Sequence, residues 1–148
     1  MNSIENIFDA GCWLRKNLRE VDNLRKMSWL KSRLLLRGSP LKNEKIHIGP
    51  SQNWLGRLWE SRLGSANGTI FKVGLEAQTT GREDSINLLE NVATKLKEHL
   101  GEGNQAGEGV LLWDGDDGNV VVQYTNVGGD RRILVVLTSN IVRQLTHR

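Results

Sequence analysis

The strongest constraint on the fold is a change in the spacing of apolar residues at Thr69. Over the positions that follow, apolar residues alternate with polar or small ones, and the apolar set is Phe71, Val73, Leu75 and Ala77. Successive side chains of a β-strand point to opposite faces, so this alternation predicts a strand with one buried face. A chain with such a strand has to bury that face against another layer of structure.

The segment after this strand has a helical period. Apolar residues recur at spacings of three and four over residues 85–100, and Gly101 can end a helix. Three apolar runs follow at residues 110–113, 119–125 and 131–138. The sequences between them, DGDDG and NVGGD, are typical of β-hairpin turns. We therefore expect one amphipathic helix and three further strands, with a final helical turn over residues 139–145.

The first quarter of the chain carries a second helical pattern. From Ile4 to Leu34, apolar residues recur every three or four positions, which is typical of an amphipathic helix. The pattern predicts either one helix over residues 3–37 or two helices separated at Asn23 or Ser28, because both residues favour caps and turns. The sequence Gly-Ser-Pro at residues 38–40 would end the helical region.

Residues 51–63 are predicted to form another helix, capped by Ser51. Its broad apolar face would consist of Trp54, Leu55, Leu58, Trp59 and Leu63. Residues 45–48 alternate between polar and apolar side chains and predict a brief edge strand. The loop GSANG at residues 64–68 then separates the helical part from the sheet.

These elements predict an α+β fold. Basic N-terminal helices lead into a small, mostly antiparallel four-stranded sheet, in the order β-α-β-β-β-α, with helices on one face. Residues 1–64 would form a basic helical arm and residues 65–148 an α+β sheet subdomain, packed together as one compact domain.

The charge is unevenly distributed between these two parts. Residues 1–65 contain 12 Lys and Arg against 6 Asp and Glu, whereas residues 66–148 contain 8 against 11. The N-terminal part is therefore basic, although the whole chain has a net charge of only +3. A basic surface of this kind attracts phosphates.

Other classes of protein find little support in the sequence. The single cysteine, Cys12, excludes an internal disulfide, and we expect it to be packed within the helical stripe. No apolar run is long enough to cross a bilayer, and the N-terminus lacks the pattern of a signal peptide. These features favour a cytoplasmic protein without a membrane partner.

The basic N-terminal region predicts a nucleic-acid site, with RNA favoured and duplex RNA as one form of it. Arginine and lysine would contact backbone phosphates, and two tryptophans would stack on bases. The predicted site residues are Arg15, Lys16, Arg19, Arg25, Lys26, Lys31, Arg33, Arg37, Trp54, Arg57, Trp59 and Arg62. Whether Trp54 and Trp59 are contact residues or core residues is left open by the sequence.

The alternative hypothesis is a protein-interaction module of the immunity, chaperone or inhibitor type. In that case the leucine stripe of the N-terminal helix would pack on a partner, and the charges would only flank it. A long amphipathic helix also suits dimerisation, so a homodimer is expected under both hypotheses.

The sequence gives little support to an enzyme. The loop at residues 101–106 matches the letters of a dinucleotide-binding motif, but it follows a helix and precedes a strand, which is the reverse of what that motif requires. Asp114, Asp116 and Asp117 lie in a turn sequence and lack the spacing of a calcium loop, which leaves a metal-dependent nuclease as a weak alternative. We predict a non-enzymatic protein with no cofactor, no metal site and no catalytic residue.

Overall fold

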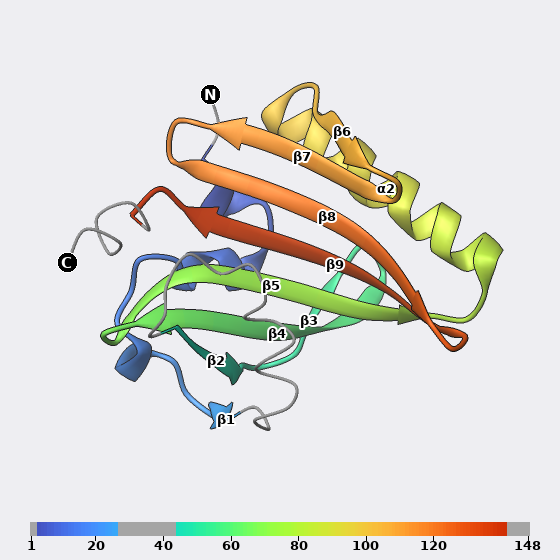
Figure 1. The fold of residues 1–148 in the computed structure, drawn as a ribbon. Coiled ribbons are helices and arrows are strands. Elements are labelled where there is room, and N and C mark those ends of the chain that lie inside the picture. Colours follow the sequence, from blue (N-terminus) through green and yellow to red (C-terminus); the bar gives the residue numbers. More distant parts are fainter. Residues whose placement is uncertain (1–2, 27–43, 142–148) are drawn as a thin grey trace.

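The computed structural model describes residues 3–26 and 44–141, and within these ranges nine strands and one α-helix dominate the fold. The strands form an antiparallel sheet in the order β1-β2-β4-β5-β9-β8-β7-β6, and β3 pairs with β4 outside this path (Figure 1). Their bounds are β1 (Arg25–Lys26), β2 (Lys45–Ile48), β3 (Gln52–Trp54), β4 (Arg57–Ala66), β5 (Thr69–Thr79), β6 (Asn104–Gly107), β7 (Val110–Gly115), β8 (Gly118–Val127) and β9 (Asp130–Ser139).

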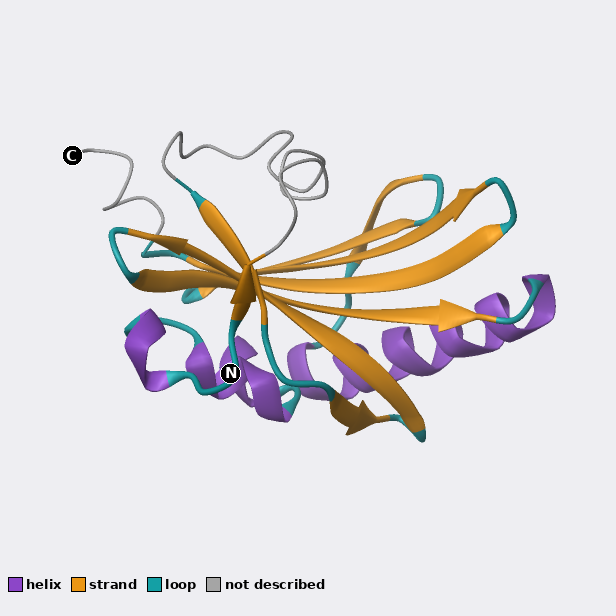
Figure 2. Cartoon of the chain, turned by 90° about the horizontal axis from the view of Figure 1, so that it is seen from below, coloured by secondary structure: helices purple, strands orange, loops and turns teal. Residues whose placement is uncertain are grey.

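All described helical elements lie on the same face of this sheet (Figure 2). They are the long helix α2 (Arg82–Leu100) and three short 3₁₀ turns, η1 (Ile4–Asn6), η2 (Asp9–Trp13) and η3 (Leu18–Glu20). We call the side of the sheet under these elements the covered face. The opposite side, on which no described helix packs, is called the open face.

The hydrophobic core lies between the sheet and the helical elements. Leu88, Val92 and Leu96 of α2 and Ile4 and Phe8 of the N-terminal segment are buried against the covered face. The strands supply the other layer, which includes Trp59, Leu63, Val73, Leu75, Trp113, Val120, Val122, Ile133, Val135 and Leu137. Burial of this apolar surface is the main force that holds the two layers together.

The register of the strands assigns side chains to the two faces. One row of paired residues runs Trp113, Val120, Leu137, Val73 and Leu63, and all five are buried in the core. The adjacent row runs Leu112, Val121, Val136, Gly74 and Arg62. Because successive residues of a strand alternate between faces, this second row lies on the open face.

The predictions for the second half of the chain are confirmed. The alternating segment after Thr69 is β5, residues 85–100 lie within α2, and α2 ends at Gly101 in a left-handed conformation (φ 88°). The three later runs are β7, β8 and β9, joined by the two expected hairpin turns. The brief strand predicted at residues 45–48 is β2, but it lies between β1 and β4 and not at the edge of the sheet. Ser139 ends β9, and residues 142–148 lie outside the described ranges.

The helix predicted over residues 3–37 is wrong for the residues that the structure describes, and the rest of it falls in the undescribed range 27–43. The segment forms short turns because its backbone bonds to the β4–β5 hairpin. The amide of Arg15 donates to the carbonyl of Ile70, and the amide of Leu18 donates to the carbonyl of Gly68. Arg15 and Asn23 also have positive φ angles, which a helix excludes. Tertiary hydrogen bonds here override a moderate helix preference.

The helix predicted over residues 51–63 is also wrong, because this segment forms the β3–β4 hairpin. Leu55 and Gly56 occupy the turn with φ angles of 52° and 71°. Glycine accepts such angles readily, and a two-residue turn with both φ values positive suits the twist of a hairpin. Every second residue from Trp59 to Leu63 points into the core: Trp59, Ser61 and Leu63 are all buried. This period of two is typical of a strand, and the helix prediction overlooked it.

The predicted fold class therefore needs correction. The structure is a large antiparallel sheet of nine strands with one α-helix, not an α+β fold with basic N-terminal helices and a four-stranded sheet. The extra strands come from the two segments that had been assigned to helices and from β6.

Candidate functional site

The open face carries a continuous group of aliphatic side chains, which we call the aliphatic patch. It consists of Val110 and Leu112 of β7, Val121 of β8, and Leu134 and Val136 of β9. All five are only partly buried, whereas Val120, Val122, Val135 and Leu137, their neighbours on the covered face of β8 and β9, are fully buried. The patch spans three adjacent strands because Leu112 pairs with Val121, and Val121 pairs with Val136.

Charged residues of both signs border this patch on the same face, and we call them the charged ladder. Its centre is Arg62, whose guanidinium lies 3.0 Å from Glu60 Oε1 and 3.1 Å from Glu76 Oε2. Arg132 lies 3.4 Å from Glu76 and 3.1 Å from Asp130, and hydrogen bonding to Asp130 is the main cause that raises the pKa of Arg132. Arg25 of β1 lies 4.0 Å from Glu60. The ladder thus has three arginines and three carboxylates.

Gly74 lies where the patch and the ladder meet. A Cβ atom built on Gly74 would be 3.7 Å from Val136, 3.8 Å from Arg62 and 3.8 Å from Leu134. These are ordinary van der Waals distances, so the three side chains surround the position that a side chain at residue 74 would occupy. Because glycine has no side chain, the middle of the open face stays flat. A flat surface fits another broad surface better than it fits a small ligand.

The open face is large enough for a protein contact. Four strand spacings separate β7 from β4, which gives a width of about 19 Å, and strands of ten residues are about 33 Å long. This is an area of roughly 600 Å², close to the roughly 800 Å² that each partner contributes to a standard interface.

Three aromatic residues of the strands lie on the covered side of the sheet. Trp59, Trp113 and Tyr124 all belong to rows that face the core. None of the residues of the aliphatic patch or the charged ladder is aromatic. The aliphatic patch and the charged ladder therefore provide no stacking platform of the kind that sheet proteins use for bases.

The tryptophans of the predicted nucleic-acid site pack in the core or against it. Trp59 is fully buried, and its Nε1 donates a 2.8 Å hydrogen bond to the carbonyl of Trp54. Trp54 is half-buried between Phe8 and Trp59, with ring centroids 5.3 Å apart in both pairs. Trp59 is therefore a core residue, and Trp54 is a half-buried residue that packs against the core.

Four of the predicted arginines take part in ion pairs. Arg62 and Arg25 belong to the charged ladder. Arg15 lies 3.3 Å from Glu5 and donates to the Ser139 hydroxyl, so it ties the N-terminal segment to the end of β9. Arg57 forms two hydrogen bonds to Asp84, of 2.6 and 3.0 Å. These guanidinium groups already have anionic partners within the chain.

The Arg57–Asp84 pair anchors the start of α2 to β4. Hydrogen bonds from Arg57 and from the Thr80 backbone hold the pKa of Asp84 well below its usual range. The same contact raises the pKa of Arg57. Both groups are therefore charged at every pH near neutrality.

The remaining members of the predicted set divide into two groups. Lys16, Arg19 and Lys26 are exposed, and within residues 3–26 and 44–141 they form no ion pair. Lys31, Arg33 and Arg37 lie outside the described residues. The structure thus leaves three predicted cations available at the surface of the N-terminal segment.

The acidic turn between β7 and β8 has a structural role. Asp117 accepts hydrogen bonds from the hydroxyl of Ser3 and the amide of Ile4, which fixes the start of the chain. A hollow of about 310 Å³ beside this turn is lined by Asp114 and Asp116. In the part of the chain that the structure describes, no three His, Cys, Asp or Glu side chains gather closely enough to hold a metal ion.

The histidines and the cysteine occupy separate positions. The ring of His99 bonds the carbonyl of Ser3 at 2.9 Å. Burial, followed by the charges of Lys26 and Lys45, lowers the pKa of His47. Cys12 is exposed, so the expectation that it packs within a helical stripe is wrong.

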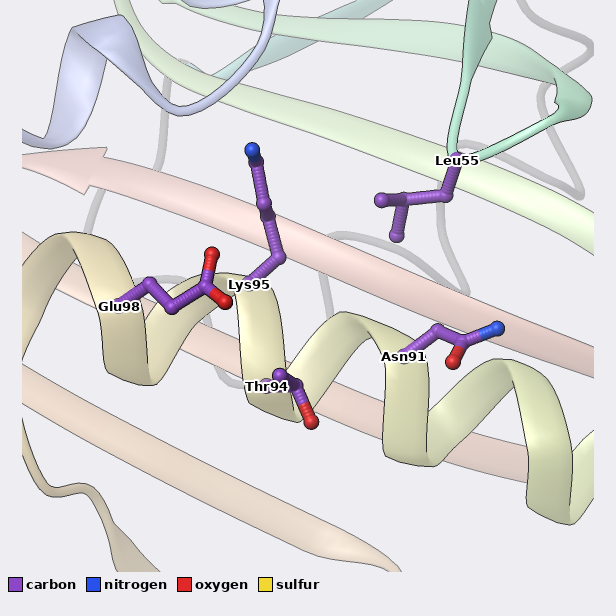
Figure 3. A pocket seen from close by; sticks show the side chains of 5 residues that line it. All are labelled: Leu55, Asn91, Thr94, Lys95 and Glu98. Atoms are coloured by element: carbon purple, nitrogen blue, oxygen red, sulfur yellow. The ribbon is translucent and has the colours of Figure 1, made fainter.

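A groove of about 270 Å³ lies between the outer side of α2 and the β3–β4 turn. Figure 3 shows Asn91, Thr94, Lys95 and Glu98 along the helix, with Leu55 reaching toward them from the turn. The lining mixes one cation, one carboxylate and two neutral polar groups around a single aliphatic side chain. This mixture selects no particular ligand chemistry.

Sequence reasoning missed the aliphatic patch, although the sequence contains a signal for it. The runs VVV at 120–122 and ILVVL at 133–137 are apolar at every position and do not alternate. A strand whose two faces are both apolar contacts another layer on each side, or a partner on one of them. The charged ladder has no comparable signal, because it depends on the register of β4, β5 and β9.

Comparison of the chain with protein-family models, curated proteins and solved structures gave no match. Among residues 3–26 and 44–141, α2 is the one α-helix, and no helix there has the length and apolar character needed to cross a membrane. The open face therefore has to be interpreted from its own chemistry.

Proposed function

We propose that this chain is a protein-interaction module and that the open face of its sheet is the contact surface. The observation that carries the proposal is the aliphatic patch beside the charged ladder on a face that no described helix covers. Contiguous exposed apolar patches rimmed by polar residues mark interaction sites on soluble proteins. The proposal replaces the N-terminal helix of the sequence hypothesis with the sheet.

The chemistry of the open face favours a folded protein as the partner. The charged ladder is balanced, with three cations and three anions, so it does not create the excess positive charge that phosphate backbones require. Aliphatic side chains bury well against aliphatic side chains of another protein. We infer a partner that places aliphatic residues opposite the patch and charges of both signs opposite the ladder.

The charged ladder contributes specificity within this proposal. Its arginines and carboxylates already neutralise each other, so a partner gains affinity only if its own charges meet theirs in a complementary order. A partner with the wrong charge order leaves charges desolvated and unpaired, which weakens the complex. This arrangement suits an inhibitor, immunity protein or chaperone that recognises one target.

The experiment compares affinity capture by three forms of the full chain. The test variant carries Val121→Asp and Val136→Asp on the open face. The control variant carries Asn91→Asp and Thr94→Asp on the outer side of α2, which adds the same charge on the other side of the sheet. Circular dichroism and thermal unfolding establish that all three forms are folded.

We expect the wild type and the control variant to capture a partner protein that the test variant fails to capture. That protein is then purified, and its Kd should rise by about a hundredfold or more for the test variant, as expected for charges placed in the centre of an interface. Equal binding of the purified protein by all three forms would contradict the proposal. Self-association of the wild type that the test variant abolishes would identify a second copy of the chain as the partner.

A second candidate function is nucleic-acid binding, with RNA favoured. It is supported by Lys16, Arg19 and Lys26, which stay exposed and without ion pairs among the described residues. Fluorescence anisotropy with a short RNA duplex at two salt concentrations tests it. Affinity should fall steeply with salt and fall further when all three residues are changed to glutamine. Binding that is indifferent to salt would exclude this function.

A further inference from the structure

A hollow of about 380 Å³ lies at the N-terminal end of α2, on the covered side of the sheet. α2 contributes Arg82, Ile86 and Leu89 to its walls, β8 contributes Tyr124, and β9 contributes Arg131. Its size is within the range of about 300–1,000 Å³ typical of small-molecule sites. It lies on the opposite side of the sheet from the aliphatic patch, so it is independent of the function proposed above.

Two arginines, Arg82 and Arg131, border this hollow. Within the described ranges, neither Arg82 nor Arg131 forms an ion pair. The Nε atom of Arg131 is also buried and has no hydrogen-bond partner in this part of the chain. A buried donor without an acceptor is costly, so Arg131 indicates an acceptor that the described residues do not supply.

The start of α2 adds to the positive potential. Its N-cap residue, Gly81, has no side chain to accept from the first-turn amides, which therefore remain partly uncapped. A Cβ atom built on Gly81 would lie 3.9 Å from Nη1 of Arg131, so this guanidinium is beside the first turn. The first turn carries two carboxylates: Asp84 is already engaged by Arg57 and Thr80, and Glu83 is exposed and does not line the hollow.

One carboxylate, Glu108 in the turn between β6 and β7, also lines the hollow. It is exposed and makes no ion pair with either arginine among the described residues. One solvated carboxylate against two guanidinium groups and a helix N-terminus leaves an excess of positive charge in the hollow.

The rest of the lining is mixed: Ser85 and Asn126 are polar, and the other three residues form an apolar wall. Leu89 and Tyr124 are half-buried at its walls, and Ile86 is 45% exposed. A bare inorganic anion would leave these side chains without a partner. A ligand with both an anionic group and an apolar body would satisfy the two halves of the lining at once.

We propose that this hollow binds a small organic anion. Its oxyanion, a carboxylate or a phosphate, contacts the guanidinium groups of Arg82 and Arg131, and its apolar body lies against Tyr124, Ile86 and Leu89. Planar guanidinium groups bind such oxyanions through paired hydrogen bonds, which explains why arginines occupy both positions.

The proposal is tested by titrating the full chain with four probes and following the amide resonances by NMR. Benzoate and phenyl phosphate carry the anion on an aromatic ring, benzamide has the ring without the charge, and inorganic phosphate has the charge without the ring. Benzoate or phenyl phosphate should shift the resonances of Arg82, Leu89 and Tyr124, and the preferred probe identifies the anionic group. Both benzamide and inorganic phosphate should bind at least about tenfold more weakly.

Two variants establish the role of the arginines. Arg82→Gln and Arg131→Gln should each weaken binding of the preferred probe by about ten- to hundredfold, because each removes a charged hydrogen-bond donor. Arg19→Gln removes an equally unpaired arginine elsewhere and should have no effect. Arg82 is exposed, so its variant remains informative even if Arg131→Gln fails to fold.

Equal binding of benzoate and benzamide would overturn the proposal, and so would probe affinities that Arg82→Gln leaves unchanged. Binding of inorganic phosphate as tight as that of phenyl phosphate would overturn the apolar half of it. These measurements use the free chain, so their outcome does not depend on the protein partner.

Discussion

The two faces of one sheet have different chemistry although the same strands form both. On β9, Ile133, Val135 and Leu137 are fully buried beneath α2 and the N-terminal segment, whereas Leu134 and Val136 stay partly exposed on the open face. The covered face is mostly apolar, with Ser61 as a buried polar residue in β4, whereas the open face combines the aliphatic patch with the charged ladder. The difference teaches that alternate residues of one strand have separate environments: one set is buried in the core and stabilises the fold, and the other stays partly exposed on the open face.

A pair of substitutions on one strand gives the largest expected effect. Leu137→Ala should destabilise the protein by about 3 kcal/mol, because it leaves a cavity in the core. Leu134→Ala removes the same atoms from the open face and should cost about 1 kcal/mol or less. Urea unfolding of both variants measures the contrast. Equal losses would mean that the open face is as tightly packed as the core.

Chemical labelling tests the accessibility of the two faces directly. In a Cys12→Ser background, which removes the exposed native thiol, Val136→Cys should react with a maleimide at least about 100-fold faster than Val135→Cys. The thiol at position 135 becomes available only when the structure opens locally. Slow labelling of both variants would show that the open face is covered in the free chain and would remove the basis of the proposed interface.

The start of α2 on the covered side offers a smaller, pH-dependent effect. Because Arg57 and Thr80 lower the pKa of Asp84, this carboxylate stabilises the folded state above its unfolded pKa of about 3.9, and the contribution is lost as the pH falls below that value. Asp84→Asn should therefore lower the Tm at pH 7, and the deficit should shrink below pH 4. Thermal scans at both pH values check this. A deficit independent of pH would point to lost packing instead.

His47 at the other border of the covered face should give the smallest effect. Its pKa is lowered by burial, Lys26 and Lys45, so the folded state favours the neutral ring. Stability from this group is complete above the unfolded pKa of about 6.5 and declines as the pH falls below it. His47→Gln should flatten the stability profile between pH 7 and pH 5, measured by urea unfolding. An unchanged slope would show that this ring titrates as it does in the unfolded chain.

The predictable part of the fold is the part in which local pattern and tertiary structure agree. The alternation in β5, the helical period before Gly101 and the turn at Gly128 and Gly129 all specify their elements without distant partners. The segment before β5 follows the opposite rule. Its residues have apolar spacings that suit a helix, but Leu18 and Arg15 take their hydrogen bonds from the β4–β5 hairpin, which no local pattern reveals.

The candidate site was harder to predict for the same reason. The open face is assembled from β7, β8, β9, β5 and β4, and its residues become neighbours only through the register of those strands. The high number of Lys and Arg residues in the N-terminal part placed Arg57 and Arg62 in the predicted nucleic-acid site. In the structure, both guanidinium groups form ion pairs with carboxylates. Charge along a chain predicts a surface only when the partners of each charge are known.

The pairing of β5 with β9 has a consequence for how the chain folds. Every other long pairing joins strands that are close in sequence, whereas this one joins Thr79 to Arg131 and Lys72 to Thr138. Closing a loop of that length costs about 3–4 kcal/mol of chain entropy before the contacts repay it. We expect the hairpins on each side of this pairing to form first and the pairing of β5 with β9 to form in the rate-limiting step. φ-value analysis at Val73 and Val135 would measure whether the contacts between these two strands are formed in the transition state. The folding rate would then depend on how fast β5 and β9 pair.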